Sequence, residues 1–457
     1  MLCSLLLVVF SQAGAPALGQ PAVSTGSAET PLFVRGVAIL DAKAGRLLPF
    51  QSVRIADGRV VEVGSAGDLQ PSDGDEVLEG RGAILSPGLA EMHGHLPDQS
   101  QGEEFARDVM FLYLSQGITT VRGMLGDEQQ LRLRSAVAKG EVRGPRLIVG
   151  SPPLHGGSAQ TPEDAKAKVA AFAEAGYEHI KVHEGLKPDV YAAICEAARE
   201  RKLRWGGHVS DQVGLFGALD AGQSTVDHLD NVLEATLPEA TLAQYAGGVP
   251  PAVLASESDL QKLDEVAERV VASRSAIVPT VVLFDTIFSG RPASEVLGER
   301  EECRYMPPAV VSNWGKLYTQ YSAAMGGDSG PEIAAARRLA FRALHGAGAT
   351  ILMGTDSPQM FSVPGFSLRR EALLMEECGM TPLEVLQSGT VAVHEYLEPG
   401  KPYGAEVGAR ADFVLLRGNP LERTDALFEI EAVIHDGRVL SRSEIEAGLA
   451  AIEAKHR

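Results

Sequence analysis

Cysteine is scarce in this chain of 457 residues, which has only Cys3, Cys195, Cys303 and Cys378. No two of them have the short spacing of a metal-binding pair, and so small a number argues against a disulfide framework. Clusters of basic residues are also absent, and 60 acidic against 41 basic residues give a formal net charge of −19. This balance argues against nucleic acid or an anionic membrane as a partner.

Long apolar runs are missing as well, apart from a short one at the start of the chain. The first residues, MLCSLLLVVFSQAGAPALGQ, join a short apolar core to small residues. This pattern is typical of a signal peptide over residues 1–19, cleaved near Gly19 and Gln20, and it predicts export to the periplasm or the medium. The basic residues that usually precede such a core are absent, so a disordered or weakly anchoring tail on a cytoplasmic protein is the alternative. The run is too short to span a bilayer, and we expect no stable membrane insertion.

Both ends of the remaining chain have the pattern of β-structure. PLFVRGVAIL and QSVRIADGRVVEVG near the start, and ADFVLLRGNPL and IEAVIHDGRVLS near the end, are short apolar runs separated by turns that contain glycine. We therefore expect residues 31–84 and 404–445 to form one small composite β-sandwich.

The middle of the chain, residues 85–403, alternates short apolar runs with longer amphipathic stretches. PEDAKAKVAAFAEAG, PDVYAAICEAARERK and SDLQKLDEVAERVVASR have helical periodicity. The eight strand candidates between such stretches are LSPGLAEMHGH, ITTVRG, RLIVG, HIKVH, RWGGHV, STVDH, AIVPTVVL and TILMGTD. Eight βα units in series predict an α/β fold with a closed parallel (β/α)8 barrel.

Polar residues that end these strands are the candidates for chemistry, because the active site of such a barrel lies at the carboxyl ends of its strands. His93 and His95 are two residues apart, so in a strand they project from the same face and can form half of a metal site. A solvated histidine pair is the alternative for this motif alone. Further candidates at strand ends are Lys181, His208, His228 and Asp356. A core histidine, a helix cap or a surface lysine explains any one of them, but not all of them together.

The ordered segments PGLAEMHGH, GITTVRGM, EHIKVHEG, GGHV, STVDHLD, AGATILMGTDSP and GARADFVLLRGNPL resemble the amidohydrolase superfamily, in its imidazolonepropionase-like and prolidase-like branch. This resemblance extends from Gly36 to about Arg438. It implies a distorted (β/α)8 TIM-like barrel with a urease-like β-sandwich built from both chain ends.

The resemblance also implies two divalent metal ions and their ligands. His93, His95 and Asp356 correspond to ligands of the more buried ion, and His208 and His228 to ligands of the second. Lys181 corresponds to a lysine that is carboxylated on its side-chain nitrogen and then bridges both ions. Nitrogen and oxygen ligands without cysteine suit Zn²⁺, with Mn²⁺, Co²⁺ or Fe²⁺ as alternatives. A bridging hydroxide is then the nucleophile, with Asp356 as the proton shuttle.

Residues that contact the substrate are harder to predict. His183 follows Lys181 by two residues and is a candidate to donate a hydrogen bond to the substrate carbonyl, although relatives often have tyrosine there. His155 is a candidate to line the site, with a plain loop histidine as the alternative. Residues 289–330 form a long connection whose aromatic residues, Tyr305 among them, predict either a lid or a helix packed on the barrel wall. Arg369 is a candidate to bind a substrate carboxylate, and an ordinary surface arginine is the alternative.

Three kinds of function remain open. The first is hydrolysis of a small amide, with a dipeptide or an N-acyl amino acid favoured as the substrate. The second is a mononuclear cyclic amidohydrolase or deaminase with an unmodified Lys181, or a lactonase or esterase on the same scaffold. The third is a non-catalytic scaffold, against which the complete ligand set argues. We expect a small-molecule substrate, and relatives of this architecture often assemble into homo-oligomers.

Overall fold

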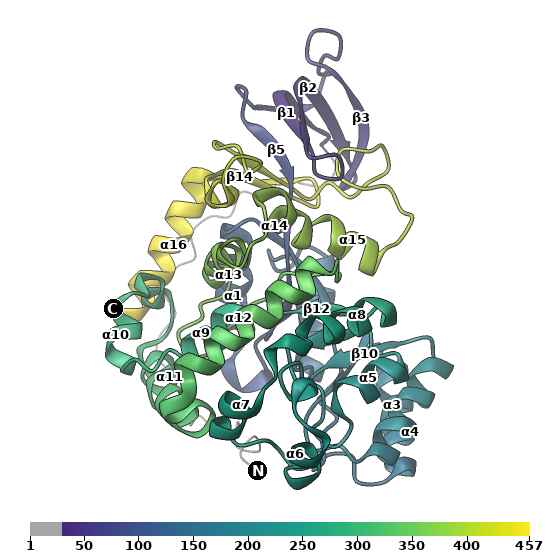
Figure 1. Ribbon diagram of the computed structural model, residues 1–457. Helices are drawn as coiled ribbons and strands as arrows, with labels where there is room; N and C mark the ends of the chain where they lie inside the picture. Colours follow the sequence, from purple (N-terminus) through teal and green to yellow (C-terminus); the bar gives the residue numbers. More distant parts are fainter. Residues whose placement is uncertain (1–29) are drawn as a thin grey trace.

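The computed structural model describes residues 30–457 (Figure 1). The predicted signal peptide and Cys3 lie outside the described residues. Within these residues the chain is an α/β protein, in which a mixed sheet occupies one end and parallel strands surrounded by helices form the larger body (Figure 1). No helix among residues 30–457 combines the length and the apolar character that crossing a bilayer requires.

Seven short strands of the larger body pair in parallel. They form a three-stranded sheet, in the order β6-β7-β8, and a four-stranded sheet, in the order β12-β11-β10-β9. Nearly all their residues are buried, as expected for parallel strands that are covered on both faces. Their bounds are β6 (Leu89–Gly94), β7 (Ile118–Gly123), β8 (Arg146–Val149), β9 (His179–Val182), β10 (Arg204–Gly207), β11 (Thr225–Asp227) and β12 (Ala276–Val278).

Helices follow most of these strands, and their ends match the signals in the sequence. Helix α3 begins after Thr161, whose hydroxyl accepts a hydrogen bond from the amide of Asp164, and it ends at Gly176 in a left-handed conformation. The longer helices are α1 (Glu103–Ser115), α2 (Glu128–Ala138), α3 (Pro162–Ala175), α4 (Pro188–Glu200), α8 (Leu263–Ser273), α11 (Pro308–Tyr321), α12 (Gly330–Gly346), α13 (Phe366–Glu377) and α16 (Arg442–His456). The shorter ones are α5 (Gly214–Ala221), α6 (Glu239–Gln244), α7 (Pro251–Glu257), α9 (Val281–Ile287), α10 (Ala293–Gly298), α14 (Pro382–Ser388) and α15 (Val391–Leu397).

The mixed sheet is built from both ends of the described chain. Its order is β15-β14-β13-β5-β1-β2-β3, with β4 paired to β1. The hydrogen bonds therefore define a single eight-stranded sheet, and they do not show the two separate sheets of the expected sandwich. The strands are β1 (Leu32–Asp41), β2 (Arg46–Ala56), β3 (Arg59–Ser65), β4 (Glu76–Glu79), β5 (Ile84–Pro87), β13 (Phe413–Leu416), β14 (Ile430–His435) and β15 (Arg438–Ser441).

Two of the expected strands are shorter than their apolar runs. In AIVPTVVL only Ala276–Val278 is a strand, because Pro279 and the left-handed Thr280 (φ 45°) end it and helix α9 begins at Val281. TILMGTD forms no extended strand among the described residues, although a parallel bridge joins Ile351 to Ile277. A short apolar run does not distinguish a buried strand from a helix, so the strand predicted from AIVPTVVL was too long.

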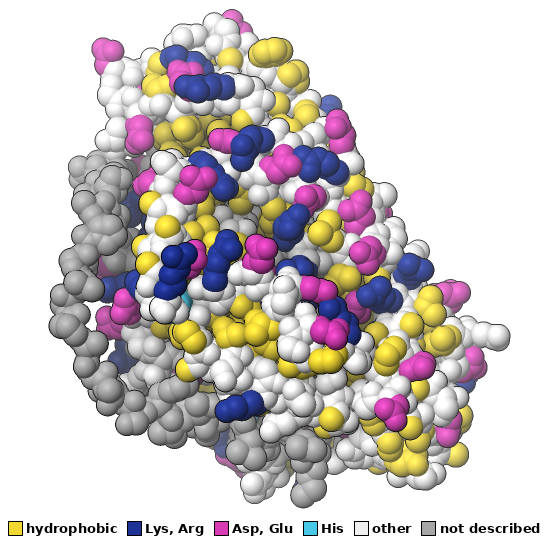
Figure 2. Space-filling view, turned by 90° about the vertical axis from the view of Figure 1, so that its left-hand side faces the viewer, with side chains coloured by type: hydrophobic (Ala, Val, Ile, Leu, Met, Phe, Trp, Pro, Cys, Tyr) yellow, Lys and Arg dark blue, Asp and Glu magenta, His cyan; other side chains and the backbone are white. Residues whose placement is uncertain are grey.

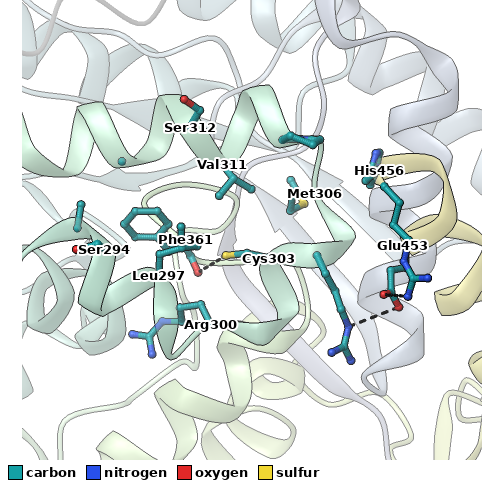
Figure 3. Close-up of a pocket in the computed structure, with 15 residues that line it drawn as sticks. Ser294, Leu297, Arg300, Cys303, Met306, Val311, Ser312, Phe361, Glu453 and His456 are labelled. Atoms are coloured by element: carbon teal, nitrogen blue, oxygen red, sulfur yellow. Dashed lines mark hydrogen bonds and ion pairs between the residues drawn. The ribbon is translucent and has the colours of Figure 1, made fainter.

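The long connection 289–330 packs as helices against the body of the protein. Tyr305, Trp314 and Tyr318 are buried in one apolar cluster with Phe361 and with Ile452 of α16. A cavity of about 600 Å³ lies among α10, α11 and α16, and Phe361, Met306 and Val311 are among its lining residues (Figure 3). For these three aromatic residues the structure therefore agrees with a packed helix rather than a lid.

Candidate metal centre

Histidines 93 and 95 lie beside the segment that contains Asp356. The amide of Asp356 donates to the carbonyl of His93 at 2.7 Å, and the amide of His95 donates to the carbonyl of Ser357 at 2.7 Å. Nε2 of His95 is 2.8 Å from Oδ1 of Asp356, and Nε2 of His93 is 3.5 Å from the same oxygen. One donor atom from each of these three residues lies within 4.8 Å of the other two, an arrangement that can hold a metal ion.

Lys181 brings its amine to the same group. Its side chain is buried at the end of β9, and Nζ is 3.3 Å from Nε2 of His93. Burial lowers the pKa of the amine below its ordinary value, although the carboxylates of Asp227 and Asp356 oppose this shift. A neutral amine is the form that can react with carbon dioxide to give a carbamate.

His208 and His228 extend the group away from His95. The ring of His228 is 4.4 Å from that of His93 and 4.5 Å from that of His208, measured between centroids. Burial and the neighbouring histidines hold the pKa of His228 well below its usual value, so this imidazole is neutral. Its Nδ1 is 2.9 Å from the hydroxyl of Thr280, whereas Nε2 is buried without a hydrogen-bond partner among the described residues. Such an orphaned nitrogen fits a metal ligand.

His183 and His155 lie on the far side of His208. The ring of His183 is 4.1 Å from that of His208 and 6.4 Å from that of His155. Nδ1 of His183 accepts a hydrogen bond from the amide of Glu184 at 2.8 Å, so the ring proton of the neutral imidazole is on Nε2. Burial lowers the pKa of His183 and favours this neutral form. The structure therefore places His183 next to His208 and His155 next to His183.

Backbone strain is concentrated at the same place. His228, Thr280 and Asp356 have positive φ angles of 63°, 45° and 64°, in the left-handed region that residues with a side chain rarely adopt. Strain of this kind is maintained when the surrounding contacts fix the geometry, and it is found mainly at functional sites.

A second layer of buried charges, which sequence reasoning missed, orients these ligands. Nδ1 of His93 donates to Oδ2 of Asp227 at 2.6 Å, and Arg122 donates to the same oxygen at 3.1 Å. Nδ1 of His208 donates to Oδ2 of Asp230 at 2.7 Å. Carboxylates that accept from the second ring nitrogen of a histidine fix its tautomer and raise its basicity as a ligand. The signal was present in STVDHLD, where the two aspartates flank His228.

Glu91 holds the segment that carries Asp356. Its carboxylate accepts hydrogen bonds from the amide of His93 at 3.0 Å and from the amide of Thr355 at 2.8 Å. The hydroxyl of Thr355 donates to its other oxygen at 2.5 Å. Burial raises the pKa of Glu91 to about 8 despite these bonds, so its charge is costly to keep in this position. Glu91 therefore ties His93 to the residue just before Asp356.

Two predicted substrate contacts have other partners. The guanidinium of Arg369 is 2.6 Å from Asp425 in an exposed ion pair, and its binding of a substrate carboxylate stays a prediction. The ring of Tyr305 stacks on Phe366, with the centroids 5.1 Å apart, and is buried. Tyr305 thus packs into an apolar cluster, and its contact with the substrate stays a prediction.

The atoms that these side chains offer as ligands show whether divalent ions fit at this site. Nitrogen and carboxylate oxygen donors, without cysteine, suit Zn²⁺ and similar cations. The lowered pKa of His93 and of His228 leaves both imidazoles with a free lone pair. Burial alone would raise the pKa of Asp356, but its contacts, which include a hydrogen bond from His95, lower it to about 2, so the carboxylate is ionised. The residues therefore fit a divalent metal site at His93, His95 and Asp356.

A model of the amidohydrolase family matches residues 84–440. The chain belongs to the amidohydrolase family. An adenine deaminase of Chelativorans sp. (strain BNC1) is 32% identical over 243 residues, which are 50% of this chain and 40% of that protein. The chain therefore spans less than half the length of this relative.

Solved structures extend the likeness of fold over most of the chain. A bottromycin amidohydrolase has a TM-score of 0.72 at 20% identity, with 93% of this chain and 90% of that chain covered. A structure described as a prolidase from Bifidobacterium longum has a TM-score of 0.65 at 23% identity, with 93% and 99% covered. The amidohydrolase described here is thus a hydrolase of this superfamily, and members of the family generally bind divalent metals.

The surface seen in Figure 2 has no large region of a single charge. Lys and Arg side chains alternate with Asp and Glu side chains across this face, with hydrophobic side chains between them.

Proposed function

We propose that this amidohydrolase hydrolyses a carbon–nitrogen amide bond in a small molecule, with a dipeptide or an N-acyl amino acid as the favoured substrate. The observation that carries the proposal is the convergence of six side chains, four of them from the ends of different parallel strands. They are His93, His95, Lys181, His208, His228 and Asp356.

Two divalent ions, with Zn²⁺ favoured by the nitrogen and oxygen donors, are proposed for this group of residues. His93, His95 and Asp356 would hold one ion, and His208 and His228 the other. Lys181 lies beside His93 with a lowered amine pKa. Reaction of its amine with carbon dioxide forms a carbamate and releases a proton, and the two carbamate oxygens can then serve both ions. Bound there, divalent ions acidify a water molecule and polarise the substrate carbonyl.

Asp356 is proposed to move the proton during hydrolysis. Its carboxylate lies between His93 and His95 and is ionised at neutral pH, so it has a free oxygen lone pair for a proton. Asp356 takes a proton from the attacking water and gives it to the leaving amine as the carbon–nitrogen bond breaks. One water is consumed, and a carboxylic acid and an amine are formed.

His183 is proposed to stabilise the substrate oxygen. Its neutral ring has the proton on Nε2, since Nδ1 accepts from the amide of Glu184. The ring lies against that of His208, with the centroids 4.1 Å apart. From there it can donate a hydrogen bond to the carbonyl oxygen, which becomes more negative in the transition state. His155, next to His183, is proposed to line the substrate site.

The two parallel sheets are also proposed to be parts of one closed barrel, and the mixed sheet to fold into a sandwich. Parallel bridges join Gly150 to His179 and Ile277 to Ile351, and the amide of Met92 donates to the carbonyl of Met353 at 2.9 Å. These contacts support closure into a (β/α)8 barrel. A common apolar cluster that includes Val34 and Phe413 supports folding of the mixed sheet into a sandwich. Export remains a proposal from the first residues alone.

A second candidate is a mononuclear deaminase or cyclic amidohydrolase, which the similarity to an adenine deaminase favours. In that enzyme Lys181 would stay an unmodified amine, and one ion per chain would suffice. Hydrolysis of lactones or esters by the same residues is a further alternative.

Amine release from a panel of dipeptides and N-acyl amino acids tests the proposal, with protein purified in Zn²⁺ and bicarbonate. We expect release from a related group of substrates and close to two ions per chain. Lys181→Ala should lose at least one ion and most of the activity, and Lys166→Ala, in an exposed ion pair with Glu196, should lose neither. No release from protein that holds two ions would contradict amide hydrolysis. One ion per chain together with ammonia release from adenine would favour the deaminase.

A further inference from the structure

Arg337 lies on helix α12 and reaches toward the second histidine pair. Its guanidinium donates to the carbonyl of His228. The carbon at its centre is 4.3 Å from the ring centroid of Phe284 and 5.8 Å from that of Phe288. The ring of Phe284 is in turn 5.6 Å from that of His228. Arg337 is therefore placed by its contacts next to a proposed ligand of the second ion.

No carboxylate among the described residues forms an ion pair with Arg337, although three acidic side chains lie in its vicinity. Asp230 accepts from His208, and Asp285 is bound by the neighbouring Arg338. Glu234 is the third, and burial raises its pKa to about 7, which disfavours its charged form. The positive charge of Arg337 is thus not matched by a dedicated partner.

The side chain is also held in a defined orientation. Stacking of a guanidinium on an aromatic ring fixes its plane, and one hydrogen bond to the carbonyl of His228 leaves other N–H groups of the fork available. Arg337 and Phe284 are both half-buried as whole residues. A planar fork of this kind binds a carboxylate through two parallel hydrogen bonds.

We propose that Arg337, stacked on Phe284, binds the carboxylate of the substrate and so restricts the amidohydrolase to amides that carry a free carboxylate, such as N-acyl amino acids and dipeptides. The inference rests on the proposed amide hydrolysis, because it names a specificity residue for that reaction. Arg337 replaces Arg369 in this role. It adjoins a ligand histidine, whereas Arg369 is engaged with Asp425.

The experiment compares an N-acetyl amino acid with its decarboxylated analogue, an N-acetyl alkylamine that has the same side chain. For wild-type enzyme we expect kcat/KM to be about 100-fold higher with the carboxylate substrate, as a charge-assisted pair of hydrogen bonds allows. In Arg337→Gln this preference should fall to within a few-fold of one, mainly through KM. The rate with the decarboxylated analogue should fall far less than the rate with the carboxylate substrate, because the analogue has no carboxylate for the guanidinium to bind.

Arg338→Gln is the matched control, since it removes the next guanidinium on the same helix, one that binds Asp285 instead. Its substrate preference should equal that of the wild type. Arg337→Lys keeps the charge without the fork and should show an intermediate preference, and it provides the test if Arg337→Gln does not fold or retain metal. An unchanged preference in both Arg337 variants would overturn the inference while leaving amide hydrolysis intact. Failure of metal-loaded wild type to release amine from either compound would overturn the proposed function, and this inference with it.

Discussion

The carboxylate of Asp227 lies 2.6 Å from Nδ1 of His93, and both side chains are fully buried. This contact turns Nε2 of His93 toward Asp356 and Lys181. Asp227→Asn should therefore reduce zinc affinity by about 10–100-fold, because the ligand loses the carboxylate that orients it. Competition with a chromophoric chelator measures this affinity.

The control for this variant is Asp220→Asn, which removes an exposed carboxylate paired with Arg269 and should leave zinc affinity unchanged. Equal zinc affinity in Asp227→Asn and in the wild type would show that His93 binds zinc without help from the carboxylate of Asp227.

Asp356→Asn tests the proton shuttle. The backbone bond from residue 356 to the carbonyl of His93 does not involve the side chain, so the fold should persist. Turnover should fall by about 10²–10⁴-fold, because the amide cannot accept the proton of the attacking water. Loss of some metal is also expected, so kcat is divided by the metal content of each sample. A metal-corrected kcat near that of the wild type would exclude Asp356 as the shuttle.

Glu371 supports the start of helix α9 from a buried position on α13. Its two oxygens accept from the amides of Val281 and Val282 at 2.9 and 2.7 Å. Glu371→Leu has a similar volume but no acceptor, so both amides lose their partner, and the free energy of unfolding should fall by about 3 kcal/mol. Denaturant unfolding measures this change. Glu376→Gln on the same helix is the control, and a loss below about 1 kcal/mol in Glu371→Leu would mean that water replaces the carboxylate.

The contacts of Glu398 predict that the free energy of unfolding depends on pH. Burial alone would raise its pKa, but hydrogen bonds from Arg146 at 2.6 Å and Lys401 at 2.9 Å hold the pKa at about 2, below the ordinary 4.5. A lowered carboxylate pKa stabilises the folded state above about pH 4.5, and this contribution is lost as the pH falls through about 2. Because the side chain is partly solvated, we expect Glu398→Gln to lose only about 1 kcal/mol at pH 7.

The difference between wild type and Glu398→Gln should shrink as the pH falls from 4.5 toward 2, which unfolding at a series of pH values measures. Glu446→Gln, in an exposed pair with Arg442, serves as the control. A difference that is constant over this range would show that packing, and not charge, accounts for the effect.

Much of the candidate site was predictable because it depends on local rules. His93 and His95 share a face through strand alternation, and the carboxyl ends of parallel strands bring Lys181, His208 and His228 to one place. The position of Asp227 beside His228 was a signal in the sequence, but strand periodicity could not show that its side chain points at His93. A strand buried on both faces gives no periodicity that distinguishes a side chain pointing at a ligand from one pointing at a helix.

The substrate contacts were the least predictable part, because they depend on tertiary neighbours. Nothing in the sequence near Arg369 indicates Asp425, and nothing near Arg337 indicates Phe284 or the carbonyl of His228. The same limit applied to AIVPTVVL, where the residues after Pro279 form a helix that the apolar pattern alone does not reveal.

Removal of the metal tests the central claim most directly. Wild-type amidohydrolase is stripped with a chelator, and amine release from an N-acyl amino acid is measured before stripping, after stripping, and after addition of Zn²⁺ with bicarbonate. The account predicts that stripping abolishes release and that two equivalents of Zn²⁺ per chain restore it. Unchanged release from protein shown to hold no metal would contradict a metal-dependent mechanism at His93, His95 and Asp356.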